Sequence, residues 1–134
     1  MKNTTVLIDG FNLYYGLLKG TQWKWLDLVS FSQALLGDDH NILAVMLEAA
    51  KPEVDGIALI TGDSDQVGAI EAARYVYGKR VLVFNPHPGL STNLKRAASY
   101  YKNIPRDLPA RCQLPDAIPV GTHGNFIRRP AAWK

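Results

Sequence analysis

The stretch Ile57-Ala58-Leu59-Ile60-Thr61-Gly62-Asp63-Ser64-Asp65 decides the fold class of this 134-residue chain. Its first four residues form a short apolar run, which is typical of a strand buried on both faces of a parallel sheet. A polar turn that carries the two acids Asp63 and Asp65 then leads into helical sequence reaching about Tyr77. A strand, a turn and a helix in this order predict an α/β domain.

A second strand of the same kind begins the chain. Val6-Leu7-Ile8 is apolar, and Asp9 follows it directly before a short helical segment from Phe11 to Leu18. The carboxyl ends of parallel strands meet at one edge of a sheet, where ligands bind in α/β folds. We therefore expect four acids to gather there: Asp9, Asp63, Asp65 and Asp39, the last of which opens a helix expected between the two strands.

Carboxylates that converge in this way repel one another unless a cation lies between them. A hard divalent cation takes oxygen ligands and retains waters for chemistry, so the four acids predict a site for Mg²⁺ or Mn²⁺. Helix capping would account for one acid after the second strand, but not for both Asp63 and Asp65. The backbone N–H groups beside Ser64, at the start of the following helix, suit a phosphate.

Apolar periodicity and glycine stops predict the remaining elements. We expect helices at residues 28–36, 41–50 and 92–102 and a third strand at 80–84, in the order β–α–α–α–β–α–β–α. Residues 105–134 contain five prolines and little periodicity. We interpret them as a proline-rich tail packed on a single domain formed by residues 1–104.

The amino-acid composition limits the classes of protein to which the chain can belong. Hydrophobic residues make up 47% of the chain and charged residues 20%, which are ordinary values for one globular domain. The single cysteine, Cys112, excludes an internal disulfide framework and fits a reducing cytosol. No apolar stretch is long enough for a signal peptide or a transmembrane helix, so we expect a soluble cytoplasmic protein without a membrane partner.

The charge is distributed unevenly along the chain. Residues 1–71 hold ten acids and four Lys/Arg, a net −6, whereas residues 72–134 hold two acids and eleven Lys/Arg, a net +9. An acidic metal site beside a basic surface suits a polyanion such as single-stranded RNA, with Lys95 and Arg96 among the residues that would contact phosphates. The alternative is a basic segment that serves solubility only.

Four blocks of the sequence resemble the signature blocks of NYN domains, which belong to the PIN-like nuclease superfamily: Ile8–Tyr14, Asp39–Asn41, Ile60–Asp65 and Gly78–Val81. Further segments are similar to one bacterial NYN subgroup: Asn85-Pro86-His87, Ser91 with Leu94 and Ala98, Gln113-Leu114-Pro115, and the Gly124…Arg129-Pro130…Trp133 ending. The resemblance implies a PIN-like three-layer α/β sandwich with a mainly parallel central sheet. It also implies metal-dependent cleavage of RNA.

By this resemblance the metal-site acids are Asp9, Asp39, Asp63 and Asp65, with Asn12 and Asn41 as supporting polar groups. His87 and Ser91 are added as candidates for contact with the substrate. His87 could also ligate metal, carry a proton or simply shape its proline-flanked loop.

The chain departs from the NYN pattern at three places. Only Gly37-Asp38 separates Leu36 from Asp39, where NYN domains usually have a further strand and a long connection. Relatives also carry acids where this chain has Ala44-Val45-Met46 and Ser99. A missing strand would leave an unpaired sheet edge, so we expect either a chain break near Gly37 or a homodimer through that edge.

These departures keep a second interpretation open, in which the domain is catalytically weak and binds RNA or a protein partner. A phosphatase built on Asp63-Ser64-Asp65 is disfavoured. Its nucleophilic Asp would follow the first strand with another Asp two residues later, where this chain has Phe11.

Overall fold

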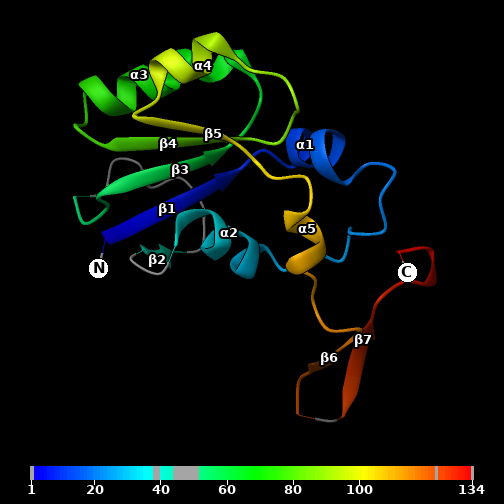
Figure 1. Ribbon diagram of the computed structural model, residues 1–134. Helices are drawn as coiled ribbons and strands as arrows, with labels where there is room; N and C mark the ends of the chain where they lie inside the picture. The colour runs from blue at the N-terminus through cyan, green and yellow to red at the C-terminus, as the bar shows by residue number, and fades with distance from the viewer. Residues whose placement is uncertain (1, 38–39, 44–51, 123, 134) are drawn as a thin grey trace.

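The computed structural model describes residues 2–37, 40–43, 52–122 and 124–133. Its centre is a sheet of five strands in the order β2-β1-β3-β4-β5 (Figure 1), and each neighbouring pair is parallel. The strands are β1 (Lys2–Ile8), β2 (His40–Leu43), β3 (Gly56–Ile60), β4 (Arg80–Asn85) and β5 (Tyr100–Asn103).

Helices cover both faces of this sheet. Figure 1 shows α3 and α4 on one face, and α1, α2 and α5 on the other. Their bounds are α1 (Gly10–Leu13), continued by the π-helical η1 (Tyr14–Leu18), α2 (Leu28–Leu36), the 3₁₀ turn η2 (Ser64–Gln66), α3 (Val67–Tyr75), α4 (Thr92–Ala97) and α5 (Leu108–Arg111). The expected three-layer PIN-like sandwich with a parallel sheet is confirmed.

Each face of the sheet has its own hydrophobic core, because successive side chains of a strand point to opposite faces. In β3, Ile57 packs against α3 and α4, whereas Ala58 and Ile60 pack toward α1, α2 and α5. The first core includes Ile70, Ala73, Val81, Val83, Leu94 and Ala97, and the second includes Val6, Leu13, Leu17, Phe31, Phe84 and Leu108. Burial of each large apolar side chain stabilises the fold by roughly 1.5–3 kcal/mol.

The prediction of a helix at residues 41–50 is wrong for the first residues of that range. His40–Leu43 forms β2, which pairs with β1 in the register Lys2↔His40 to Thr5↔Leu43; residues 44–51 lie outside the described part. A short apolar run does not distinguish helix from strand by periodicity, and here the open edge of β1 offers a pairing partner. The edge of β1 that we expected to be unpaired is therefore covered. The junction residues Asp38 and Asp39 lie outside the described residues.

The helix expected at residues 92–102 is also shorter than predicted. It ends at Ala97, Ala98 adopts an extended conformation with ψ 154°, and Tyr100–Asn103 pairs with β4 as β5. Ser99 guides this change, because its N–H donates to the carbonyl of Val81 at 2.8 Å and its Oγ accepts from the N–H of Val81 at 3.1 Å. The chain thus gains a fifth strand.

The proline-rich tail begins inside the sandwich and ends outside it. Leu108 and Cys112 are buried in the core around α5, and burial raises the pKa of the Cys112 thiol. Beyond them, β6 (Ala117–Val120) and β7 (Asn125–Arg128) form an antiparallel hairpin, which Figure 1 shows extending away from the sheet. The sequence pattern did not lead us to expect this hairpin.

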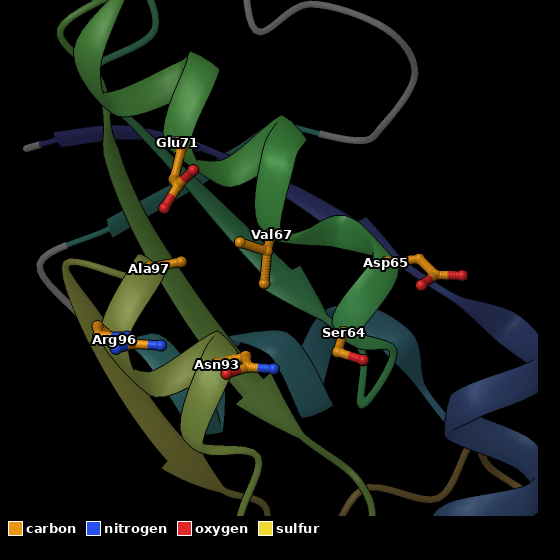
Figure 2. A pocket seen from close by; sticks show the side chains of 7 residues that line it. All are labelled: Ser64, Asp65, Val67, Glu71, Asn93, Arg96 and Ala97. Carbon is orange, nitrogen blue, oxygen red and sulfur yellow. The ribbon is translucent and has the colours of Figure 1, made fainter.

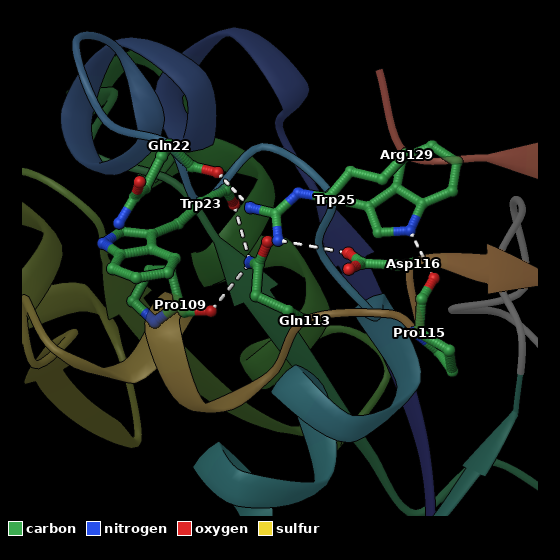
Figure 3. A network of polar contacts seen from close by, with 8 residues as sticks. All are labelled: Gln22, Trp23, Trp25, Pro109, Gln113, Pro115, Asp116 and Arg129. Atoms are coloured by element: carbon green, nitrogen blue, oxygen red, sulfur yellow. Dashed lines mark hydrogen bonds and ion pairs between the residues drawn. The ribbon is translucent and has the colours of Figure 1, made fainter. Parts of the chain in front are cut away.

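Polar contacts fasten the tail to the connection between η1 and α2 (Figure 3). Gln113 Nε2 donates to the carbonyl of Trp23 at 2.8 Å, and Trp25 Nε1 donates to the carbonyl of Pro115 at 2.8 Å. Arg129 donates to the carbonyl of Gln22 at 2.7 Å and forms an ion pair with Asp116 at 3.6 Å. The segment that contains Gln113 and Arg129 therefore serves to hold the 22–25 loop.

No helix of the described segments combines the length and the apolar character that crossing a bilayer requires.

Candidate active site

Asp9 is held between the two central strands. The register Ile8↔Ile60 places it at the carboxyl edge of the sheet, and its N–H donates to the carbonyl of Ile60 at 2.9 Å. Its carboxylate caps α1, because Oδ1 accepts from the N–H of Asn12 at 3.1 Å and Oδ2 accepts from Asn12 Nδ2 at 2.6 Å. The half-buried carboxylate therefore has a fixed orientation.

Asn12 connects Asp9 to the loop that follows β4. Its Oδ1 accepts from the N–H of Gly62 at 3.2 Å and lies 3.0 Å from His87 Nε2. Because Nδ2 of Asn12 faces the acceptor Asp9, Oδ1 is the accepting end, and Nε2 of His87 carries the proton. His87 is positioned in turn by its own N–H, which donates to Asn85 Oδ1 at 2.9 Å.

Gly62 lies at the closest approach of these three segments. A Cβ atom built on Gly62 would meet His87 Cδ2 at 2.5 Å and Asn85 Oδ1 at 2.7 Å. Both distances are shorter than carbon and oxygen atoms tolerate, so only glycine fits here without a shift of the loop. The ends of β1, β3 and β4 therefore pack together around this residue.

Asp63 joins the site through Thr61. The fully buried Thr61 hydroxyl accepts from the N–H of Asp63 at 3.1 Å and donates to Asp9 Oδ2 at 3.3 Å. Asp63 also caps η2, because its Oδ1 accepts from the N–H of Asp65 at 2.9 Å. The Thr61 hydroxyl thus joins the Asp9 carboxylate, after β1, to the backbone of Asp63, after β3.

A cavity of about 400 Å³ lies beside this cluster, between η2, α3 and α4 (Figure 2). It is lined by Ser64, Asp65, Val67, Glu71, Asn93, Arg96 and Ala97. Figure 2 shows Arg96 on α4 and Glu71 on α3 on opposite sides of the cavity, whereas the Asp65 carboxylate points away from Arg96. The cavity is therefore polar and of mixed charge, which suits a phosphate group accompanied by a cation.

The remaining basic and polar candidates lie on α4. Ser91 caps this helix, since its Oγ accepts from the N–H of Leu94 at 3.5 Å, and the N–H of Ser91 donates to Tyr101 Oη at 3.1 Å. Lys95 is exposed next to Arg96 but is not among the residues that line the cavity. The structure thus gives Ser91 a capping contact and places Lys95 at the outer surface.

One predicted site residue, Asn41, is not brought to this edge. Asp39 lies outside the described residues. Asn41 pairs in register with Asn3 near the start of β1, six residues before Asp9 and thus roughly 20 Å away along the strand. The expected helix would have started at the carboxyl edge, whereas the chain enters β2 at the opposite edge.

The described residues contain no group of three or more His, Cys, Asp or Glu able to hold a metal ion. The donors that they do bring to the sheet edge are the hard oxygen ligands Asp9 and Asp63. Mg²⁺ is commonly bound by one or two carboxylates and several waters. The described donor set therefore fits a largely hydrated ion rather than a closed four-acid cage.

Sequence reasoning missed Thr61, Asn85, Glu71 and Asn93. Thr61 was detectable in principle, because it directly follows a buried strand in the stretch that also holds Asp63. Asn85 belongs to the Asn85-Pro86-His87 loop, in which only the histidine was predicted to be a site residue. Glu71 and Asn93 join the cavity only because α3 and α4 pack side by side, as their shared apolar core shows.

Comparisons with known proteins agree with this fold. The NYN domain family matches residues 36–105, just over half of the chain. A segment of 44 residues is 62% identical to 6-hydroxy-3-succinoylpyridine 3-monooxygenase of Pseudomonas putida, but the match covers only 28% of this chain and 14% of that enzyme.

Among solved structures, a protein of unknown function from Vibrio parahaemolyticus superposes with a TM-score of 0.60. The superposition covers 79% of this chain and 94% of that protein at 15% sequence identity, which supports the fold alone. The family match over just over half of the chain shows that the chain belongs to the NYN domain family, a nuclease-like family.

Proposed function

We propose that the protein is a metal-dependent endoribonuclease that hydrolyses phosphodiester bonds of single-stranded RNA in the reducing cytosol. The observation that supports the proposal is that the Thr61 hydroxyl, at the end of β3, donates to the Asp9 carboxylate after β1 and accepts from the backbone N–H of Asp63. Family membership supports the same reaction class.

The proposed metal is Mg²⁺ or Mn²⁺, held by Asp9 and Asp63, with Asp65 and Asp39 as the further acids of the set. Bound there, the ion would lower the pKa of a water molecule and offset charge on the scissile phosphate. In the hydrolysis, water forms the new P–O bond, the ester P–O bond breaks, and the leaving oxygen takes a proton. No protein nucleophile is required.

The side chains around the acids have separate roles in this proposal. Asn12 fixes the orientation of Asp9 by two hydrogen bonds and sets the position of His87 by a third contact. Arg96 in the cavity wall and Lys95 beside it hold the phosphates of the RNA chain. Such contacts position a nucleic acid without selecting its sequence.

The direct test is cleavage of labelled single-stranded RNA with Mg²⁺, with Mn²⁺ and with EDTA. The wild type is expected to cut only with metal, and Asp9→Asn is expected to lose most of this activity. Asp107→Asn is the matched control, because it removes an exposed carboxylate that pairs with Arg111 on the surface. Equal cleavage by Asp9→Asn and wild type would refute the proposal.

A second candidate is a catalytically weak domain that binds RNA or a protein partner. It is favoured by the lack of a three-acid group among the residues that the structure describes. Salt-dependent RNA binding without cleavage under every metal condition would support the RNA-binding form. Absence of RNA binding at low salt would support a protein partner. The homodimer that we expected would have to use a surface other than the edge of β1, which β2 covers, and sedimentation velocity tests for it.

A further inference from the structure

The outer face of α1 and η1 carries an unusual set of exposed aromatic side chains. Leu13, Gly16, Leu17 and Leu18 turn one side of this segment into the core. On the other side, Phe11 is 78% exposed and Tyr15 is 55% exposed. Large apolar side chains gathered on a surface generally mark a binding site. We call Phe11, Tyr15 and the adjoining Lys19 the aromatic ladder.

The rings of the ladder are ordered with respect to one another. Phe11 and Tyr15 lie parallel, with an interplanar angle of 3° and 6.3 Å between centroids. Tyr14 packs edge-on against Tyr15 at 5.1 Å, and Lys19 Nζ lies over the Tyr15 ring, 4.9 Å from its centroid. The two rings therefore share one orientation, with the cation of Lys19 over Tyr15 and with Phe11 as the more exposed ring.

The ladder starts two residues after Asp9, on the helix that Asp9 caps. Asn12, which contacts both Asp9 and His87, belongs to the same turn as Phe11. A ligand that stacks on Phe11 would therefore lie within one helical turn of the residue that caps α1, Asp9.

We propose that the aromatic ladder is a stacking platform for bases of the single-stranded RNA, next to the phosphate at the Asp9 site. The proposal rests on the proposed function for its substrate class. Every base has a flat π-face, so stacking on aromatic side chains binds single strands with little sequence preference. Lys19 supplies a positive charge for the phosphate of a stacked nucleotide.

The size of the ladder argues against a protein partner. Its aromatic rings, with Tyr14, present on the order of 350 Å² of exposed surface. A specific protein interface uses about 800 Å² on each partner. A patch of this size instead matches one or two bases.

The experiment measures binding of a single-stranded RNA that contains 2-aminopurine, whose fluorescence falls on stacking, in EDTA at low salt. The double variant Phe11→Ala/Tyr15→Ala is expected to bind about tenfold more weakly and to lose the quenching. The aromatic variant Phe11→Tyr/Tyr15→Phe is expected to retain both. These side chains are exposed, so the fold should tolerate the changes, which melting curves verify.

Tyr75→Ala is the matched control. Tyr75 is 74% exposed and has its own cation, Arg74, 5.2 Å from its ring centroid, but it lies at the far end of α3. Its replacement is expected to change neither affinity nor quenching.

The outcomes separate this inference from the proposed function. If the double alanine variant keeps its affinity and its quenching and still cleaves RNA, the stacking role of the aromatic ladder is refuted. The proposed nuclease function is then unaffected. Failure of the wild type to bind or cleave any RNA would overturn both proposals. A change in sedimentation of the double variant without a change in RNA binding would show a contact between protein molecules, and would also overturn the inference.

Discussion

His87 Nε2 lies 3.0 Å from Asn12 Oδ1, although 75 residues separate the two in sequence. The contact crosses over β3, because Asn12 follows β1 and His87 follows β4. It closes the carboxyl edge of the three central strands around Gly62, whose N–H donates to the same Asn12 oxygen. The orientation of the Asp9 carboxylate therefore depends on a loop far along the chain.

The metal proposal is tested by Asp63→Asn. The amide keeps an oxygen in the position that accepts from the N–H of Asp65, so the cap of η2 is preserved. We expect most cleavage to be lost, with metal-free stability equal to or above that of the wild type because carboxylate repulsion is relieved. Mg²⁺ or Mn²⁺ should raise the Tm of the wild type but not that of the variant. An equal shift in both would exclude the metal site.

Gly62→Ala tests the close approach at the sheet edge. The new methyl group would press on His87 and Asn85 at distances under 3 Å. We expect a loss of about 1–3 kcal/mol in the free energy of unfolding and a fall in cleavage. Gly68→Ala in α3 is the control, because nothing lies within 4 Å of its Cβ position. That change should be neutral or stabilising by about 0.5–1 kcal/mol. Equal stabilities of the two variants would contradict the packing described.

The phosphate-contact role of α4 is tested by Lys95→Ala/Arg96→Ala. Removal of two cations should weaken binding of unrelated single-stranded RNAs to a similar degree and reduce the salt dependence of affinity. RNA titrations at several salt concentrations, with Ca²⁺ to limit cleavage, measure this slope. The metal-induced shift in Tm should remain. Arg80→Ala/Arg111→Ala removes the same charge elsewhere, and an identical slope change in that control would show only a general charge effect.

Asp27 provides a test through pH. Its carboxylate caps α2, and hydrogen bonds from the backbone and side chain of Ser30 lower its pKa. A group whose pKa is lower in the folded state stabilises the protein above its unfolded value of about 3.9, and this contribution is lost as the pH falls through the folded value. Asp27→Ala should cost about 1 kcal/mol at pH 7.

This cost should shrink as the pH falls below about 3.9, because the unfolded carboxyl group then takes up a proton while the folded one is still ionised, and it should be lost once the pH reaches the lowered folded pKa. Urea unfolding at about pH 7, 4 and 3, on both sides of the unfolded value, measures the difference. Asp107→Ala is the control, because Asp107 precedes α5 without a capping hydrogen bond from its side chain. A cost of Asp27→Ala that does not change with pH would argue against a role for the charged carboxylate.

Arg129→Ala tests how the tail is fastened. Arg129 has only 13% of its side chain exposed and contacts Gln22 and Asp116, whereas its neighbour Arg128 is exposed. Loss of a buried charge-assisted hydrogen bond typically costs about 1.5–3 kcal/mol. We expect Arg129→Ala to lower unfolding stability by this amount and to increase proteolysis in the 22–25 loop. Arg128→Ala should do neither, and equal behaviour would contradict the fastening role.

The sequence by itself determined the α/β class, the strands around Val6, Ile57 and Val81, and the placement of Asp9 and Asp63 directly after two of them. These features are local: apolar runs, turn residues and capping acids stand next to each other in the chain. The resemblance to NYN domains, carried by the same short blocks, was confirmed by the family match.

Tertiary structure alone decided the rest. His40–Leu43 became a strand because β1 offered unpaired backbone groups, and Tyr100–Asn103 did so beside β4. Segments this short have no periodicity that distinguishes a strand from a helix. Whether a neighbouring strand is available for pairing therefore decides which of the two forms. The contact of Asn12 with His87 and the fastening of the tail by Arg129 likewise depend on residues that only folding brings together.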